Sequence, residues 1–376
     1  MKRRALLRAG AASLMGLAAA PLIGKPSTAA DWSDCCPAEG EIRLCCNENP
    51  YGPSPLARQA IQDSLVRGNR YPQAALKSLK QAIADANGLS PEQVFVAPGS
   101  VSILRLAAWW LARQQKAVLS SEHTFQWLLR FARQLGSDVI TVPATDSMHF
   151  DLSAIKNRLD KDVGLVYLCN PNNPTSTSLP LTEIQQFCRT VAPDYPVFLD
   201  EAYVEYLPDF QTHNAAVLLA DYSQLMISRT FSKIYGMAGM RIGYLLAAPE
   251  IVTEMESLDI GFNISVSNVS AEAALASLSD TTFLSESLAQ NEKSRSILLE
   301  QLSTWNIPHF GSTANFVYAD VSRYGVDDMK AAFAEKEIVL NPHTIKDKNY
   351  LRISLGRPSE MEALGQRLNQ FFTKHK

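Results

Sequence analysis

The sequence predicts an α/β protein, in which a large domain with a mostly parallel sheet between helices is joined to a smaller α+β domain. Three observations lead to this prediction. The chain of 376 residues, 46% hydrophobic and 19% charged, is long enough for two domains. Short apolar segments alternate with helical ones over most of its length, which is typical of a parallel sheet. The pattern changes near Ser267, where a long helical tract runs to Trp305 and strands follow it.

The expected elements follow one another in chain order. Amphipathic helices are predicted over residues 55–66, 74–87 and 103–115. Buried strands are predicted over residues 94–97, 117–120, 139–142, 164–169 and 196–199, and two later strands over residues 315–320 and 350–354. The predicted domains are an export signal (1–30), an N-terminal arm that is part of the small domain (31–60), a large domain (61–266) and a small C-terminal domain (267–376).

The first 30 residues have the layout of an export signal. Lys2, Arg3, Arg4 and Arg8 precede a mild apolar run, and Thr28-Ala29-Ala30 offers a small-x-small cleavage site. The arginine pair followed by two leucines resembles a twin-arginine signal, so we expect a periplasmic or secreted protein. The alternative is an uncleaved basic amphipathic start on a cytoplasmic protein.

Composition narrows the range of partners. The net charge of -3 gives no electrostatic reason to expect nucleic acid or an anionic membrane surface. No segment reaches the roughly 18 uninterrupted apolar residues of a spanning helix.

Four of the six cysteines form two doublets, Cys35-Cys36 and Cys45-Cys46. In an oxidising compartment they could be disulfide-bonded, and otherwise they would be thiols. Because neighbouring cysteines rarely bond each other, pairing between the doublets is favoured over pairing within one. The spacing is not that of a zinc site, and no metal is expected.

Lys233 carries the most informative motif of the chain. It follows the hydroxyl side chains Thr230 and Ser232 and precedes Arg241. An amine can form a Schiff base with an aldehyde, while hydroxyls and a guanidinium bind a phosphate. Standing alone, a Ser-Lys pair would more often be a solvated lysine in a polar loop.

Other polar motifs follow predicted strands, where parallel α/β sheets bind their ligands. Gly99-Ser100-Val101 opens a helix, and the backbone N–H groups there suit a phosphate. Asn173 lies in the turn after residues 164–169 and could donate to a phenolic oxygen, although a simple turn is the alternative. Asp200 and Tyr203 follow residues 196–199, where a carboxylate could hold a pyridine nitrogen protonated. The alternative for this carboxylate is a helix cap on the surface.

In order and spacing, these segments resemble the fold-type-I pyridoxal-phosphate aminotransferases of class I/II, and among them the histidinol-phosphate aminotransferase-like group. The resemblance covers residues 43–372. It rests on the blocks Asn-Glu-Asn-Pro-Tyr-Gly, Arg-Tyr-Pro, Asn-Pro-Asn-Asn-Pro-Thr, Asp-Glu-Ala-Tyr, Ser-Lys and Arg-Ile-Ser. It implies pyridoxal 5'-phosphate as cofactor and a homodimer with shared active sites.

The resemblance also implies roles for individual residues. Lys233 would form the Schiff base and shuttle the proton, and Asp200 would pair with the ring nitrogen. The remaining cofactor-binding residues are Asn173 and Tyr203 at the ring hydroxyl, Phe125 or Trp127 on the ring face, and Ser100, Val101, Thr230, Ser232, Arg241 and the neighbouring subunit's Tyr71 at the phosphate. The substrate would meet Arg352, whose fork grips its carboxylate, together with Tyr51 and Asn173.

The sequence departs from this group at three positions. Val101 replaces an acidic residue that is common there, and Ser176 replaces a glycine. Asn341 stands where histidinol-phosphate enzymes have a second substrate-phosphate arginine. Since losing a bidentate phosphate contact weakens binding, we expect the substrate to be an ordinary L-amino acid with an aromatic or uncharged side chain.

The main functional hypothesis is therefore a transaminase that moves an amino group from an L-amino acid to a 2-oxo acid. A pyridoxal-phosphate-dependent lyase, decarboxylase or cyclase is the first alternative, because the ring-binding residues do not fix which bond is broken. A non-catalytic pyridoxal-phosphate-binding protein is the second, and the presence of both Lys233 and Arg352 argues against it.

Overall fold

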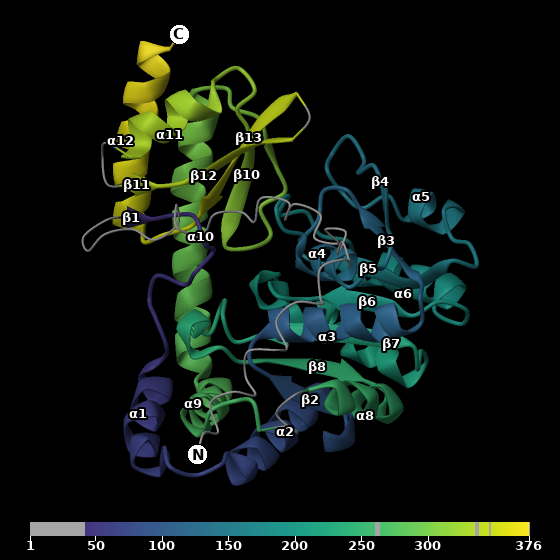
Figure 1. Ribbon diagram of the computed structural model, residues 1–376. Coiled ribbons are helices and arrows are strands. Elements are labelled where there is room, and N and C mark those ends of the chain that lie inside the picture. Colours follow the sequence, from purple (N-terminus) through teal and green to yellow (C-terminus); the bar gives the residue numbers. More distant parts are fainter. Residues whose placement is uncertain (1–41, 260–263, 335–337, 346, 376) are drawn as a thin grey trace, which may run out of the picture. The chain divides into compact units, whose positions relative to one another are not determined.

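The computed structural model describes residues 42–259, 264–334, 338–345 and 347–375 (Figure 1). The predicted export signal and the cysteines at positions 35 and 36 lie outside these residues. The α/β prediction is confirmed: a large, mostly parallel sheet is accompanied by a smaller antiparallel one.

The large sheet has the strand order β2-β8-β7-β6-β5-β3-β4. Only β8 runs antiparallel to its neighbours, β2 and β7. The strands are β2 (Val94–Ala97), β3 (Ala117–Ser121), β4 (Val139–Val142), β5 (Val163–Cys169), β6 (Val197–Asp200), β7 (Leu225–Thr230) and β8 (Gly243–Ala247).

Helices connect and cover these strands. They are α1 (Pro55–Ser64), α2 (Gln73–Asn87), α3 (Ser100–Arg113), α4 (Trp127–Gln134), α5 (Leu152–Asn157), α6 (Leu181–Val191), α7 (Phe210–His213), α8 (Pro249–Leu258) and α9 (Asn268–Ser279). Local signals fix several ends: Ser54 accepts from the backbone of Ala57 at the start of α1, and Gly88 ends α2 with a φ of 67°.

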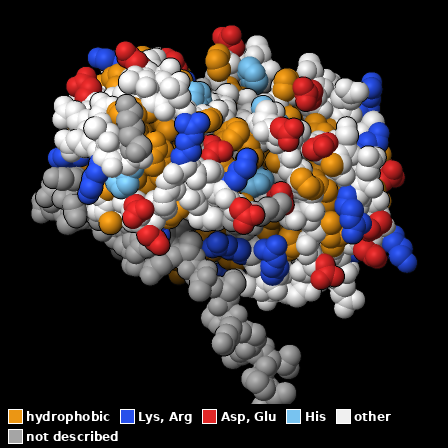
Figure 2. All heavy atoms as spheres, turned by 90° about the horizontal axis from the view of Figure 1, so that it is seen from above, with side chains coloured by type: hydrophobic (Ala, Val, Ile, Leu, Met, Phe, Trp, Pro, Cys, Tyr) orange, Lys and Arg blue, Asp and Glu red, His pale blue; other side chains and the backbone are white. Residues whose placement is uncertain are grey.

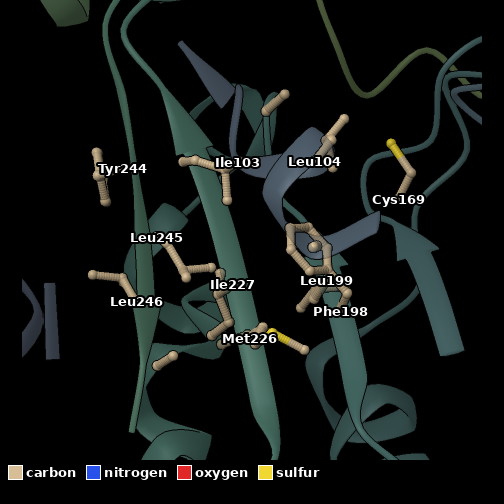
Figure 3. Close-up of a cluster of buried hydrophobic side chains, with 14 of the residues drawn as sticks. Ile103, Leu104, Cys169, Phe198, Leu199, Met226, Ile227, Tyr244, Leu245 and Leu246 are labelled. Carbon is tan, nitrogen blue, oxygen red and sulfur yellow. The ribbon is translucent and has the colours of Figure 1, made fainter. Parts of the chain in front are cut away.

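The core of the large sheet is continuous and apolar. Figure 3 shows Ile103 and Leu104 of α3 beside Phe198 and Leu199 of β6, Met226 and Ile227 of β7, and Leu245 of β8. These side chains are fully buried. Such a core holds the ends of the parallel strands rigidly in place, which is where the polar motifs lie.

The sequence analysis missed β7 and β8. In β7 the apolar run is interrupted by Ser228 and Arg229, which are nevertheless buried. Arg229 forms a 2.6 Å ion pair with Glu201 and donates to Asn87 and Asn214. Hydrogen-bond and ion-pair partners from distant segments therefore allow the polar residues of β7 to be buried in the middle of the sheet.

The second sheet is antiparallel and has the order β12-β13-β10-β9. Its strands are β9 (His309–Phe310), β10 (Phe316–Asp320), β12 (Asn341–Ile345) and β13 (Lys348–Ser354), while β1 (Ile42–Arg43) pairs in parallel with β11 (Ile338–Val339). A separate apolar core joins this sheet to α10 (Thr281–Thr304), α11 (Val326–Ala334) and α12 (Pro358–Lys374).

The predicted helical tract after Ser267 is two helices. Asp280 ends α9 and caps α10, because its carboxylate accepts from the backbone of Phe283. The helix α9 packs on α1 and α2 and belongs to the core of the large sheet, whereas the sequence analysis placed every residue from 267 in the small domain. Leu44 belongs to the second core and Ala57 to the first, so the arm passes from one core to the other.

The surface carries both signs of charge. Basic and acidic side chains are interspersed on the face shown in Figure 2. Among the described helices, none combines the length and the apolar character that crossing a bilayer requires.

Candidate active site

Four predicted site residues lie where strands of the large sheet end. Asp200 is the last residue of β6 and Thr230 the last of β7, Asn173 lies in the loop after β5, and Ser100 opens the helix after β2. Carboxyl ends of parallel strands share one edge of a sheet, so this topology gathers motifs that are far apart in the sequence.

The carboxylate of Asp200 is buried, with 1% of its surface exposed. The Ser228 hydroxyl donates to one of its oxygens at 2.9 Å, and the Tyr167 hydroxyl donates to the other at 3.2 Å. Burial raises the pKa of Asp200 to about 6, although both hydrogen bonds act in the opposite direction. Such a carboxylate is positioned to accept a hydrogen bond from a protonated ring nitrogen.

The Tyr203 hydroxyl accepts hydrogen bonds from two asparagine side chains. Asn47 donates at 3.0 Å and Asn173 at 3.4 Å. Burial raises the pKa of Tyr203, so its hydroxyl stays protonated and can itself donate. The Tyr203 hydroxyl and the side-chain amides of Asn47 and Asn173 therefore lie together, and all three can hydrogen-bond to the hydroxyl of an aromatic ring.

The amine of Lys233 lies among backbone carbonyls and positive charges. It donates to the carbonyl oxygens of Cys46 at 3.2 Å and Asn47 at 3.1 Å. Burial, followed by the positive charge of Arg352, lowers its pKa to about 8. A substantial fraction of this amine is therefore neutral, and hence nucleophilic, at a mildly alkaline pH.

The guanidinium of Arg352 lies on β13 and faces the loops of the large sheet. It donates to the Asn173 side-chain oxygen at 2.9 Å and to the backbone carbonyl of Cys45. Its Nε is buried and lacks a hydrogen-bond partner within the described chain. A planar cation with one uncommitted donor suits a carboxylate ligand.

A group of small and polar residues surrounds the start of α3. The Thr230 hydroxyl donates to that of Ser232 at 2.9 Å. A Cβ added at Gly99 would lie 2.5 Å from Nη2 of Arg241, so this glycine lets the guanidinium approach the helix N-terminus. Ser100 and Val101 form the first turn of α3 there. A helix N-terminus, hydroxyls and a guanidinium are all groups that can bind an anion.

The aromatic candidates occupy different places. The backbone N–H of Phe125 faces the sulfur of Cys169 at the end of β5, beside Asp200. Trp127 begins α4 and its ring lies 5.4 Å from that of Phe131. The backbone of Phe125 therefore lies near Asp200, because Cys169 is paired with Asp200 in the sheet, and the choice between the two aromatic rings stays a prediction.

The two predicted tyrosines, Tyr51 and Tyr71, have different surroundings within one chain. Tyr51 contacts Gln290 and lies under Arg357, whose guanidinium carbon is 5.8 Å from the ring centre. Tyr71 is 72% exposed. Within one chain, the side chain of Tyr71 is thus open to the surface.

Sequence reasoning missed several residues of the site. Tyr167 and Ser228 hold Asp200, and Asn47 donates to Tyr203 while its carbonyl accepts from Lys233. Asn47 stands at the head of the Asn-Glu-Asn-Pro block, and this was an available signal. Tyr167 and Ser228 are polar residues within buried strands, but no local pattern in the sequence connects either of them to Asp200.

Comparisons with known proteins point to one family. The family described as aminotransferase class I and II matches residues 39–368. The chain is 34% identical over 330 residues to histidinol-phosphate aminotransferase 1 of Cupriavidus pinatubonensis, covering 86% of each protein. It is 32% identical over 333 residues to the histidinol-phosphate aminotransferase of Brevibacillus brevis, covering 88% of this chain and 90% of that one.

Solved structures show the same likeness. A putative histidinol-phosphate aminotransferase from Erwinia carotovora atroseptica matches with a TM-score of 0.85 and 30% identity, over 90% of this chain and 98% of that one. The histidinol-phosphate aminotransferase of Sinorhizobium meliloti, solved with pyridoxal-5'-phosphate, matches with a TM-score of 0.81 and 25% identity over 89% and 91% of the two chains.

Proposed function

Because the chain belongs to the class I and II aminotransferases, a pyridoxal-phosphate-dependent enzyme family, we propose that it moves an amino group from an L-α-amino acid to a 2-oxo acid. We propose further that histidinol phosphate is not its preferred donor. The observation that carries this proposal is that Asn341, the residue paired with Arg352 across the sheet, is uncharged.

The residues present fit pyridoxal phosphate. Asp200 offers a buried carboxylate to the ring nitrogen, and Gly99 leaves space for Arg241 at the N-terminus of α3, where a phosphate would bind. When bound, this cofactor supplies an aldehyde and an electron-withdrawing ring.

The chain's own groups then do the following. Lys233 presents an amine that is partly neutral near pH 8 and can take or give a proton. Asp200 stabilises a positive ring nitrogen, since Ser228 and Tyr167 fix its two oxygens. Tyr203 and Asn173 orient the ring hydroxyl, and Arg352 orients the substrate carboxylate relative to Lys233.

The neighbours of Arg352 support the substrate proposal. In the pairing of β12 with β13, Asn341 lies opposite Arg352, so the two side chains share one face of the sheet. His343 is two residues further along β12, on the same face. Burial lowers its pKa to about 4, so it is neutral at pH 7, and it lies 3.1 Å from the hydroxyl of Tyr318.

This surface suits one carboxylate and an uncharged side chain. A phosphate ester carries up to two negative charges, and bidentate arginine contacts are its usual partners. Neutral Asn341 and His343 provide no such contact. The stacked rings of Tyr318 and Tyr350, whose centres are 4.9 Å apart, give this region an aromatic character that favours an aromatic or apolar donor.

A donor comparison tests the proposal. The purified, cofactor-loaded protein is assayed with aromatic and aliphatic L-amino acids and with histidinol phosphate, and the 2-oxo product is quantified. We expect kcat/KM for the best amino acid to exceed that for histidinol phosphate. Replacing Asn341→Arg should raise kcat/KM for histidinol phosphate by about tenfold or more, because it restores a charged contact.

Asn341→Gln is the matched control and should leave histidinol phosphate a poor donor. A wild-type preference for histidinol phosphate would refute the substrate proposal. Ammonia or carbon dioxide released in place of a 2-oxo acid would favour a lyase or decarboxylase.

We also propose that the protein is exported through its first 30 residues. The cationic start, the apolar run and Thr28-Ala29-Ala30 support this. Cell fractionation with N-terminal sequencing checks it, and recovery of the intact N-terminus in the cytosol would contradict it.

A further inference from the structure

Two neighbouring cysteines lie inside the candidate active site. Cys45 and Cys46 follow β1 at a bend of the chain, and their sulfur atoms are 3.4 Å apart. Cys45 is 1% exposed, whereas Cys46 is half-buried. The pair therefore combines one more accessible and one enclosed sulfur within contact distance.

The backbone of this pair holds both functional cations. The Cys45 carbonyl accepts from Arg352, and the Cys46 carbonyl accepts from the amine of Lys233. The Cys45 carbonyl belongs to the peptide group between the two cysteines. Any covalent link between the two side chains closes a ring that contains this peptide group.

We propose that Cys45 and Cys46 form a modification site, at which a low-molecular-weight disulfide oxidises them to a reversible disulfide between adjacent residues. The Cys46 thiolate attacks one sulfur of the small disulfide and expels a thiolate, leaving a mixed disulfide. The Cys45 thiolate then attacks the Cys46 sulfur and expels the second thiolate. The two cysteine protons go to the two released thiols, so two cysteines are oxidised and one small disulfide is reduced.

Charge favours the first step. The Cys46 sulfur lies within electrostatic range of Lys233 and of Arg43. Nearby positive charges stabilise a thiolate, which is the attacking species.

The geometry also makes the link easy to reverse. Adjacent Cα atoms are about 3.8 Å apart across a trans peptide, whereas disulfides usually span about 4.4–6.8 Å. A bond outside this range is strained and more readily reduced, as in regulatory rather than structural disulfides. This proposal places the link within one doublet, whereas the sequence favoured pairing between the doublets, which stays an untested prediction because Cys35 and Cys36 lie outside the described residues.

Closing the ring should reorient the Cys45 carbonyl and so displace Arg352. We expect the KM for an amino-acid donor to rise by about tenfold, with a smaller change in kcat, because a charged hydrogen bond is lost. This consequence rests on the proposed function. The modification itself does not.

The test uses the full-length, cofactor-loaded protein. It is treated with oxidised glutathione or with dithiothreitol, digested without reduction, and examined by mass spectrometry and thiol titration. We expect one peptide containing both Cys45 and Cys46 that has lost two hydrogens, together with the rise in KM, and recovery of both upon reduction. In the Cys45→Ser variant and in the Cys46→Ser variant, KM should be the same after treatment with oxidised glutathione as after treatment with dithiothreitol.

Two control variants locate the effect. Cys188→Ala removes a buried cysteine of α6 and should keep the full response. A double Cys35→Ser, Cys36→Ser variant should also keep it. Three results would each overturn the proposal. They are loss of the response in that double variant, a stable glutathione adduct on Cys46, and an unchanged KM after the link has formed. A reduced protein that turns over no amino acid would instead contradict the proposed function, while the thiol titration would still decide the modification.

Discussion

Lys233 owes its chemistry to its surroundings, because a solvated lysine would be almost fully protonated at neutral pH. Burial comes first among the causes that lower its pKa, and the charge of Arg352 second. The residue that we propose to bind the substrate carboxylate therefore also lowers the pKa of the Lys233 amine.

This coupling can be measured. Only the neutral amine attacks an aldehyde, so capture of pyridoxal phosphate should increase as the pH rises through about 8. Arg352→Gln removes a positive charge, which raises the pKa of Lys233 and moves the midpoint of capture to higher pH. Stopped-flow absorbance at a series of pH values gives the midpoint.

Arg357→Gln serves as the control, since Arg357 is not among the charges that lower the pKa of Lys233. An unshifted midpoint in Arg352→Gln, or an equal shift in Arg357→Gln, would disprove the coupling.

Residues with their own reactive group were accessible to sequence analysis, and their supporting residues were not. Lys233, Asp200 and Arg352 stand in distinctive blocks. Tyr167 and Ser228 act through Asp200, and their role depends on the pairing of β5, β6 and β7 side by side. That pairing joins segments that no local pattern connects.

At the level of elements, the loop that carries Lys233 is held against the N-terminal arm. Gly236 has a φ of 67°, and a Cβ added there would lie 2.0 Å from the carbonyl oxygen of Gly52. Asn49 reinforces the contact by donating to the carbonyl of Ile234 at 2.7 Å. The arm thereby fixes the position of the reactive amine.

We expect Gly236→Ala to separate the arm from this loop. The free energy of unfolding should fall by about 1–3 kcal/mol, because both the backbone conformation and the space are lost. Affinity for pyridoxal phosphate should weaken as well. Urea unfolding of the cofactor-free protein and a cofactor titration measure the two effects.

Gly239→Ala is a matched control three positions along the same segment. Nothing lies within 4 Å of a Cβ there, and its φ is not positive. The change in stability should stay within about 0.5 kcal/mol. Equal effects of the two substitutions would show that the contact with Gly52 does not hold the loop.

Most strands and helices could be predicted from alternating apolar segments, and the exceptions have physical causes. The strand β7 carries Arg229, whose burial depends on Glu201, Asn87 and Asn214. The helices α9 and α10 read as one tract, because the break between them falls at Asp280 with no glycine or proline beside it.

At the level of the whole molecule, the two-sheet architecture was predictable, whereas the assignment of α9 was not. Its membership of the large core depends on contacts with α1 and α2, which lie about two hundred residues earlier in the chain. The association of two chains likewise depends on surface residues, and the only sequence signal used for it is the Arg-Tyr-Pro block, which contains Tyr71.

We propose that two chains form a homodimer in which each contributes Tyr71 to the other's phosphate site. Its 72% exposure in a single chain supports this. Tyr71→Phe should weaken affinity for pyridoxal phosphate about tenfold while the protein stays dimeric, because one hydrogen bond to a charged group is lost. Sedimentation and cofactor titration measure the two properties.

Tyr222→Phe is the control, because Tyr222 packs beside the core of the large sheet. A monomeric protein that binds the cofactor at full strength would contradict shared sites, as would unchanged affinity in Tyr71→Phe.

The most direct test of the whole account is chemical labelling at Lys233. The full-length protein is incubated with pyridoxal phosphate, reduced with borohydride and mapped by mass spectrometry, with Lys233→Ala as the control. We expect a stable pyridoxyl-phosphate adduct on Lys233 and no adduct at that peptide in the variant. Labelling of a different lysine, or no adduct in the wild-type protein, would contradict the account.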